Sequence, residues 1–249
     1  MFDAHEEIRY HRHFYLPDFG RKGQEKLKQS SILIIGLGGL GSPLALYLCA
    51  MGIGTLGLVD HDRVELSNLQ RQVIYTEKDL GRYKTQAMLD RLLERNSSLK
   101  CHIFTEELSK KNHHLLDDFD LIVDGTDNFE IRYLLNDLCY RKEKPLLMGA
   151  IEQWRGLCAL FFPSKGPCYR CLFPEKPLPE EFPSCAFHGV LGVLPGLVSM
   201  IQSTEAVRFC AGLFPSSLGR VYKISTNPIE VKTLCLPSDE GCLLSHSSC

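Results

Sequence analysis

The sequence predicts an α/β protein built on a doubly wound, mostly parallel sheet with an antiparallel C-terminal extension. A short apolar run at residues 32–35 leads directly into a glycine-rich turn, which is typical of a buried parallel strand. Strand-like and helix-like segments then alternate over the first 150 residues. Two final strand-like runs are close enough in sequence to pair antiparallel.

Each element is expected where the hydrophobic pattern changes period. Short apolar runs predict strands, and apolar residues at helical spacing predict helices. The expected strands cover residues 32–35, 55–59, 100–104, 120–123, 145–148, 157–162, 220–225 and 229–234. The expected helices cover residues 42–51, 84–95, 129–141 and about 196–212.

Length and composition limit the functional classes. The chain has 249 residues and a formal net charge of −2, which excludes nucleic-acid or membrane binding that rests on bulk charge. We expect one domain over residues 1–249, with a nucleotide-binding core at about 30–150 and a crossover and C-terminal part at about 163–249. Four prolines at residues 173–183 exclude a regular helix or central strand there.

The first residues are acidic and lack the apolar segment of a signal peptide. The most apolar stretch, residues 190–201, is shorter than the roughly twenty residues that span a bilayer, so we expect a buried helix there. These features favour a cytoplasmic protein without membrane contact. In that compartment eleven cysteines suggest metal binding or catalysis rather than disulfides.

The glycine turn has the pattern Gly36-x-Gly38-x-x-Gly41 between a strand and a helix. Glycines let the backbone approach phosphate oxygens, and the helix N-terminus supplies unpaired N–H donors. Asp60 follows the second strand, where its carboxylate can accept ribose hydroxyls. The pattern predicts a Rossmann-like nucleotide site but leaves NAD and ATP as alternatives.

Cationic and amide side chains distinguish the two nucleotides. Residues 67–72 include Asn68 and Arg71, Lys84 opens a helix, and residues 125–128 follow the fourth strand. All three places lie where doubly wound sheets bind ligands. Arg and Lys can neutralise a triphosphate and a carboxylate can hold Mg²⁺, whereas hydride transfer needs neither. As isolated residues, Arg71 and Lys84 would instead be solvated surface charges.

Several blocks of sequence, in order along nearly the whole chain, resemble the MoeB/ThiF/HesA family, bacterial relatives of ubiquitin-activating enzymes. The blocks are RYHR at 9–12, GLGGLG at 36–41, DHD at 60–62, SNLQR at 67–71, Lys84, DGTDN at 124–128, CYRC at 168–171 and GVLGVLPG at 189–196.

The resemblance implies an ATP-dependent adenylyltransferase. Its partner would be a small ubiquitin-like sulfur-carrier protein ending in Gly-Gly, whose terminal carboxylate attacks the α-phosphate of ATP and releases pyrophosphate. Molybdenum cofactor, thiamine and cysteine-forming pathways use such enzymes. We expect the sulfur to come from a separate donor protein.

The resemblance also implies roles for single residues. Gly39 would contact the phosphates and Asp60 the ribose, Asp127 would hold Mg²⁺, and Arg12 would reach the site of the second subunit in a homodimer. Asn68, Arg71 and Lys84 would bind and polarise the triphosphate. The remaining expected nucleotide-binding residues are Gly36, Gly38, Gly41, Asp62, Ser67, Gln70, Thr126 and Asn128.

Cys168 and Cys171 have the spacing of half a zinc knuckle. In the resembling family a second cysteine pair completes the site. Here Cys242 is present but Ser245 stands at the fourth position, so His246 or Cys249 would be the last zinc ligand. The alternative is an eroded site without metal.

The other cysteines divide into two groups. Cys185 in the crossover is either a covalent attachment point for the carrier or a flexible-loop thiol. The remaining cysteines are expected to be small core residues: Cys49, Cys139 and Cys210 in helices, and Cys101, Cys158 and Cys235 in or beside strands.

Two other functions share the glycine turn. An NAD-dependent oxidoreductase would leave Arg71, Lys84 and Asp127 without a role. A nucleotide-binding scaffold that only docks a carrier-like partner would account for the altered second cysteine pair, but not for the complete ATP set.

Overall fold

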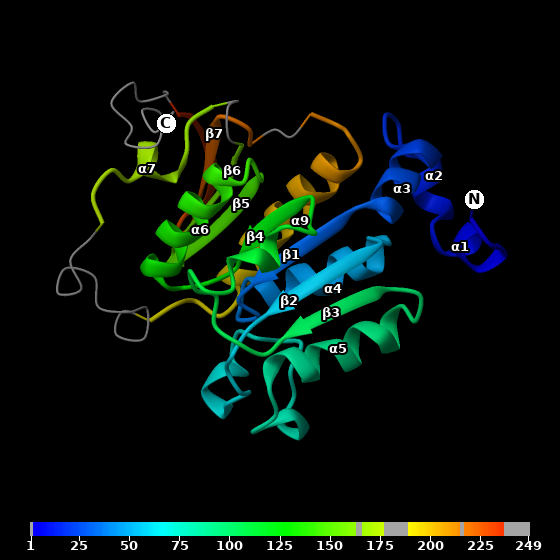
Figure 1. The fold of residues 1–249 in the computed structure, drawn as a ribbon, viewed down its shortest axis with the longest axis horizontal. Helices are drawn as coiled ribbons and strands as arrows, with labels where there is room; N and C mark the ends of the chain where they lie inside the picture. The colour runs from blue at the N-terminus through cyan, green and yellow to red at the C-terminus, as the bar shows by residue number, and fades with distance from the viewer. Residues whose placement is uncertain (1, 163–165, 177–188, 215–216, 237–249) are drawn as a thin grey trace.

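A computed structural model describes residues 2–162, 166–176, 189–214 and 217–236. Its described strands form one eight-stranded sheet in the order β3-β2-β1-β4-β5-β6-β7-β8 (Figure 1). The strands are β1 (Ser31–Ile35), β2 (Thr55–Val59), β3 (Lys100–Phe104), β4 (Leu121–Asp124), β5 (Leu146–Glu152), β6 (Arg155–Phe161), β7 (Arg220–Thr226) and β8 (Ile229–Cys235).

The first five strands are parallel, as predicted. β1 pairs with β2 on one side and with β4 on the other, so the chain changes direction across the sheet between β1 and β4. A doubly wound sheet opens a crevice at such a switch point, beyond the carboxyl ends of its strands. The candidate position for a ligand in this fold is therefore the turn where Gly36 follows β1.

The last three strands join antiparallel, which confirms the predicted C-terminal extension. β5 is longer than the predicted 145–148, because its ladder with β6 continues to the pair Glu152–Arg155. Gln153, at φ 50°, and Trp154 make the two-residue turn between these strands. Glu152, Gln153 and Trp154 are exposed, so hydrophobicity alone could not extend the strand.

Helices cover both faces of the sheet (Figure 1). One core contains apolar residues of α4 (Gly41–Met51), α5 (Lys84–Arg95) and α9 (Leu194–Cys210), and the other contains those of α6 (Phe129–Arg141). Alternate residues of β1 enter the two cores, Ile32 and Ile34 on one side and Leu33 and Ile35 on the other. β1 is thus buried on both faces, as its continuous apolar run predicts.

Three helices precede the sheet and were not predicted: α1 (Ala4–Arg9), α2 (His11–Phe14) and α3 (Gly20–Gln29). They lie beyond the start of β1, at the end of the sheet opposite the switch point (Figure 1). The residues that α3 buries are Gly23, Gln24 and Leu27, so this helix has almost no apolar periodicity to detect.

Short helical segments complete the described chain. They are the 3-10 helices η1 (Leu66–Asn68), η2 (Glu77–Asp79) and η3 (His113–Leu116), and the α-helix α7 (Tyr169–Leu172).

The expected buried helix at residues 190–201 needs correction. Helix α9 begins only at Leu194, where Pro195 occupies the first turn, and Val193 before it is 71% exposed. Proline is favoured in a first helical turn because its missing N–H would be unpaired there. None of the described helices is long and apolar enough to cross a membrane.

The core assignment of the cysteines is confirmed for Cys49, Cys139, Cys158 and Cys210, which are buried. Cys101 is partly buried. The assignment is wrong for Cys235, which is exposed at the end of β8, because this edge strand has no covering layer in the described part of the chain.

Candidate functional site

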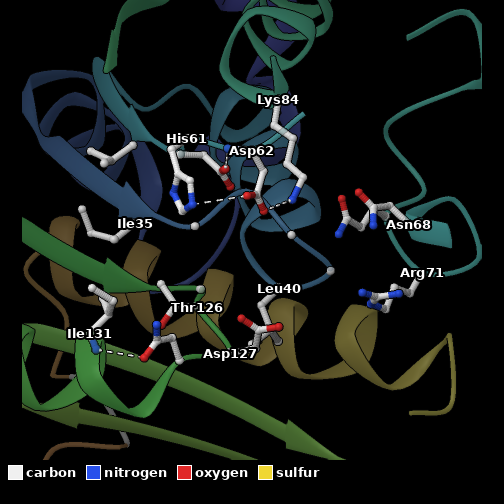
Figure 2. A pocket seen from close by; sticks show the side chains of 18 of the residues that line it. Ile35, Leu40, His61, Asp62, Asn68, Arg71, Lys84, Thr126, Asp127 and Ile131 are labelled. Atoms are coloured by element: carbon white, nitrogen blue, oxygen red, sulfur yellow. Dashed lines mark hydrogen bonds and ion pairs between the residues drawn. The ribbon is translucent and has the colours of Figure 1, made fainter. Parts of the chain in front are cut away.

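A cavity of about 410 Å³ opens at the carboxyl ends of β1, β2 and β4 (Figure 2). The glycine turn, the end of β2, the segment around η1, the first residue of α5 and the β4–α6 loop all contribute to its wall. Twelve of the predicted nucleotide-binding residues line it: Gly36, Gly38, Gly39, Asp60, Asp62, Asn68, Gln70, Arg71, Lys84, Thr126, Asp127 and Asn128.

Close backbone packing shapes the glycine turn. Gly36 has φ 86°, a conformation that favours glycine. A Cβ on Gly41 would lie 1.9 Å from the carbonyl oxygen of Gly36. Gly41 does not line the cavity, but its missing side chain lets α4 begin directly against the turn. A Cβ on Gly39 would lie 3.0 Å from Pro195, so α9 bounds the turn from outside.

Asp60 joins the glycine turn to the end of β2. Its carboxylate accepts hydrogen bonds from the backbone N–H of Leu37 at 2.7 Å and of Asp62 at 2.8 Å, one at each oxygen. Burial raises the pKa of Asp60, while Lys84 and these two N–H groups act to lower it. Each carboxylate oxygen retains a second lone pair that could accept a hydroxyl.

The two cations of the site are held differently. Lys84 is buried, and its Nζ lies 2.7 Å from Oδ2 of Asp62. Arg71 is partly buried and donates from Nη1 to the carbonyl oxygen of Ser67 at 3.2 Å. Ser67 does not line the cavity but positions Arg71 through its main chain.

The cavity has a polar and an apolar end. Asn68 and Arg71 stand on one side in Figure 2, while Ile35 and Ile131 stand on the other. An apolar slot beside cationic side chains can hold a planar base at one end and phosphates at the other. Glu106, Glu107 and Leu108 also line the cavity, and sequence reasoning missed them because no motif marks their positions. His61 lines it too; it lies within the DHD block, but no role was assigned to it.

The β4–α6 loop presents Asp127 at the cavity. Asp124 lies beneath it, accepting at Oδ1 from the backbone N–H of Thr126 at 2.8 Å and from its hydroxyl at 2.7 Å. Arg132 donates to the carbonyl oxygen of Thr126 at 2.7 Å, and its Nε lies 3.5 Å from Oδ2 of Asp124. Asn128 caps α6 by accepting from two backbone N–H groups. Asp127 itself is exposed.

Sequence reasoning did not assign positioning roles to Asp124 and Arg132. Both side chains are buried, although the helical pattern around Arg132 gives no sign that a charged residue points inward. The carboxylate of Asp124 loses hydration on burial, which raises its pKa, and Arg132 acts against this rise.

Magnesium suits the exposed carboxylate of Asp127, because Mg²⁺ in nucleotide sites usually binds one or two carboxylates together with substrate phosphates. Asp60, His61 and Asp62 also bring ligand atoms within 4.8 Å of one another. In that group Asp60 already bonds two N–H groups and Asp62 pairs with Lys84. Asp127 therefore remains the better candidate.

Cys168 and Cys171 lie side by side at the start of α7, with their sulfurs 3.9 Å apart. Two thiolates bound to one tetrahedral zinc ion at about 2.3 Å would be about 3.8 Å apart, so the pair fits half of a zinc site. The other expected ligands, Cys242 and either His246 or Cys249, lie outside the described residues, as does Cys185.

Arg12 does not line the cavity. It lies exposed on α2, and this helix is at the opposite end of the sheet (Figure 1). Within one chain the structure therefore does not bring Arg12 together with the other predicted residues.

The chain is similar to proteins that are named adenylyltransferases. Residues 10–244 match the model of the ThiF family. The chain is 45% identical over 215 residues to the sulfur carrier protein adenylyltransferase of Thermus thermophilus, covering 84% of this chain and 79% of the relative.

Two further comparisons concern length and fold. The chain is 45% identical over 214 residues to the maize adenylyltransferase and sulfurtransferase MOCS3-1, covering 86% of this chain but only 46% of the relative. It thus spans about half the length of that protein. The crystal structure of Escherichia coli MccB has the same fold, with a TM-score of 0.85 at 23% identity over 98% of this chain and 73% of MccB.

Replacing Arg132 by Met tests the buried support of the β4–α6 loop. Because Asp124 would keep its burial but lose its cation, we expect the free energy of unfolding to fall by about 3–5 kcal/mol at pH 8. The pKa of Asp124, already raised, would rise further. An acid whose pKa is higher in the folded than in the unfolded protein makes the folded protein less stable as pH rises. The loss of unfolding free energy in Arg132→Met should therefore be smaller at pH 5 than at pH 8.

Urea unfolding at pH 5 and pH 8 measures both effects. The matched control is Arg141→Met at the exposed end of α6, which should change the free energy of unfolding by less than about 0.5 kcal/mol. Equal losses for the two variants, or a deficit at Arg132 that does not change with pH, would contradict the assignment.

Proposed function

The chain belongs to the ThiF family, and we propose from this premise that it is an ATP-dependent adenylyltransferase. Its substrate in this proposal is the C-terminal glycine carboxylate of a small ubiquitin-like sulfur-carrier protein. The observation that carries the proposal is a single cavity that combines the glycine turn, two cations and the exposed carboxylate of Asp127.

The chemistry needs no nucleophile from the enzyme. A carboxylate oxygen of the carrier forms a bond to the α-phosphorus of ATP, the bond from that phosphorus to the bridging oxygen breaks, and pyrophosphate leaves with the electron pair. Catalysis then rests on alignment and charge neutralisation. The glycine turn would hold the phosphates, Asp60 the ribose, and Asn68, Arg71 and Lys84 the negative charge that moves to pyrophosphate. Mg²⁺, when bound at Asp127, would neutralise part of the same charge.

Relatives support the choice of substrate. The Thermus relative is named for the adenylation of a sulfur carrier, and the maize relative for adenylyl transfer and sulfur transfer. A carrier with a C-terminal Gly-Gly, serving molybdenum cofactor or thiamine biosynthesis, is the partner we propose. A separate sulfur donor and a covalent step at Cys185 stay predictions.

Replacing Asp127 by Ala tests the reaction. We expect carrier-dependent exchange of labelled pyrophosphate into ATP to fall by about 100-fold or more, because the charge on the departing pyrophosphate would lose its metal clamp. The free energy of unfolding should not change, since the side chain of Asp127 is exposed.

Glu130→Gln is the matched control, because Glu130 is an exposed carboxylate in the first turn of α6, close in sequence to Asp127, and does not line the cavity. It should retain exchange. Full activity of Asp127→Ala would remove Asp127 from the metal role. A wild-type chain that binds ATP but shows no exchange with Gly-Gly-ending carriers would favour the scaffold hypothesis.

We also propose that the active protein is a homodimer to which Arg12 contributes across subunits. The position of Arg12, exposed and far from the cavity of its own chain, supports this arrangement. A guanidinium from the second subunit would add a third cation to the triphosphate end.

Coexpression of two inactive variants tests the homodimer. Arg12→Ala and Asp127→Ala should each lack exchange activity, but a mixed dimer keeps one site with both residues. If half of the dimers are mixed, about a quarter of wild-type activity should return. Recovery of no activity would show that Arg12 acts within its own chain, and full exchange activity of Arg12→Ala alone would show that Arg12 has no role in the reaction.

A structural zinc ion held by Cys168 and Cys171 is a further part of the proposal, together with Cys242 and either His246 or Cys249. The sulfur separation of 3.9 Å supports it.

Metal analysis of the purified protein tests the zinc site. We expect about one zinc per chain in the wild type and its loss in Cys168→Ser, with a lower melting temperature, because a structural zinc contributes directly to folding. Cys101→Ser on β3, at the far edge of the sheet, is the control and should retain the metal. A metal-free wild-type protein with the same melting temperature would contradict the proposal.

A further inference from the structure

The deepest cation of the cavity is bound to an acidic residue of the same cavity. Lys84 is 5% exposed, and Asp62 holds it twice: Oδ2 lies 2.7 Å from Nζ, and the Asp62 carbonyl accepts from the Lys84 backbone N–H at 3.0 Å. A buried ammonium needs such a partner, because burial without one is costly. Asp62 therefore supplies the charge that Lys84 requires when no phosphate is present.

The surrounding chain fixes this contact. Residues 63–83 form a loop that connects Asp62 to Lys84, and backbone hydrogen bonds close this loop at its base. The N–H of Val64 donates to Arg82, and the N–H of Gly81 donates to Val64, each at 2.9 Å. The Arg63 guanidinium lies 3.8 Å from the Tyr83 ring centroid and also donates to the Gly81 carbonyl. The pair thus has the geometry of a positioned contact rather than of two mobile surface chains.

The two partners differ in exposure. The side chain of Asp62 is 52% exposed, whereas that of Lys84 is only 6% exposed. When Lys84 turns to another anion, Asp62 can be solvated at little cost. Its second oxygen also lies 3.4 Å from Nε2 of His61. A phosphate that enters the cavity can therefore replace Asp62 beside Lys84, because it is an anion. A neutral water molecule cannot.

The excess of acidic residues in the cavity makes the pairing of Lys84 important for binding a phosphate. Among the described residues that line it, five are acidic and only two are Arg or Lys; the acids are Asp60, Asp62, Glu106, Glu107 and Asp127. A triphosphate adds more negative charge. It must compete with Asp62 for Lys84, and repulsion from Asp62 persists after the exchange.

We infer that Asp62 is the counter-ion of Lys84 when no phosphate is bound. The triphosphate displaces the Asp62 carboxylate from Lys84 on binding, and Asp62 pairs with Lys84 again when pyrophosphate leaves. The inference rests on the proposed function, because it names the fate of that reaction's product. No covalent bond changes in this exchange. Asp62 is a positioning residue that lowers the affinity for pyrophosphate and so promotes its release.

Titration calorimetry with magnesium pyrophosphate and with magnesium ATP tests the inference without a carrier. In Asp62→Asn, which keeps the shape of the side chain but removes its charge, we expect pyrophosphate to bind about tenfold more tightly at low ionic strength, and ATP to bind more tightly as well. A purely structural role would predict weaker binding, so a gain of affinity separates the two.

Two further variants control the experiment. Glu94→Gln removes an exposed charge elsewhere on α5 and should leave both dissociation constants within twofold of the wild type. Adding Lys84→Met to Asp62→Asn should abolish the gain, because Lys84 is the group for which Asp62 and the phosphate compete. Unchanged or weaker pyrophosphate binding by Asp62→Asn would overturn the inference, and weaker binding would favour Asp62 as a metal ligand.

NMR of the wild-type protein gives a second test that does not depend on the folding of a variant. The signals of the Lys84 ammonium and of the Asp62 carboxyl carbon should both move when magnesium pyrophosphate is added. A bound state in which the Asp62 signal does not move overturns the counter-ion exchange alone. A wild-type chain that binds neither ATP nor pyrophosphate overturns both this inference and the proposed function.

Discussion

The site depends on how the glycine turn is fixed from several sides. Asp60 bonds the N–H of Leu37 from the end of β2, and Tyr75 donates from its hydroxyl to the carbonyl of Leu37 at 2.9 Å. Ser199 of α9 donates to the carbonyl of Leu40 at 2.6 Å. These contacts fix the turn, whose residues Gly36, Gly38, Gly39 and Leu40 line the cavity just before α4 begins.

Burial divides the acidic residues that end or follow β2 and β4 by task. Asp60 and Asp124 are 8% and 1% exposed, and both hold loops by accepting backbone N–H groups. Asp62 and Asp127 are exposed and keep carboxylate oxygens available to a cation. A buried carboxylate must keep its hydrogen bonds, whereas an exposed one can exchange partners with water at little cost. Each of the two segments therefore carries one buried carboxylate that supports a loop and one exposed carboxylate that is available to a ligand.

Sequence patterns located the elements that carry a strong local signal. The bounds of α5, α6 and β3 agree with the prediction, because the apolar residues of each recur at a clear spacing. The glycine turn and the residues that follow β2 and β4 were assigned to the same sheet edge, and the structure brings them to one cavity.

Other features depend on contacts that no local pattern records. Helix α3 is stabilised by the packing of Leu27 and Gln24 against later parts of the chain, including a bond from Gln24 to the carbonyl of Met51. Arg132 resembles any polar residue of an amphipathic helix until Asp124 is placed beneath it. The pairing of Asp62 with Lys84 requires that the intervening residues 63–83 close on themselves, which only the tertiary structure reveals.

The C-terminal part of the chain belongs to the site as much as the parallel strands do. Gln202 of α9 donates to the carbonyl of Asp124 at 3.1 Å, at the end of β4, and Pro195 stands against Gly39 of the glycine turn. Gly192 packs against Gln70 in the segment that carries Arg71. Residues 192–202 therefore contact three of the segments that form the cavity, and removing α9 would release the glycine turn and the β4 end together. This dependence supports the proposal that residues 1–249 act as one domain, because the nucleotide-binding core at about 30–150 lacks part of its own support without the C-terminal helix.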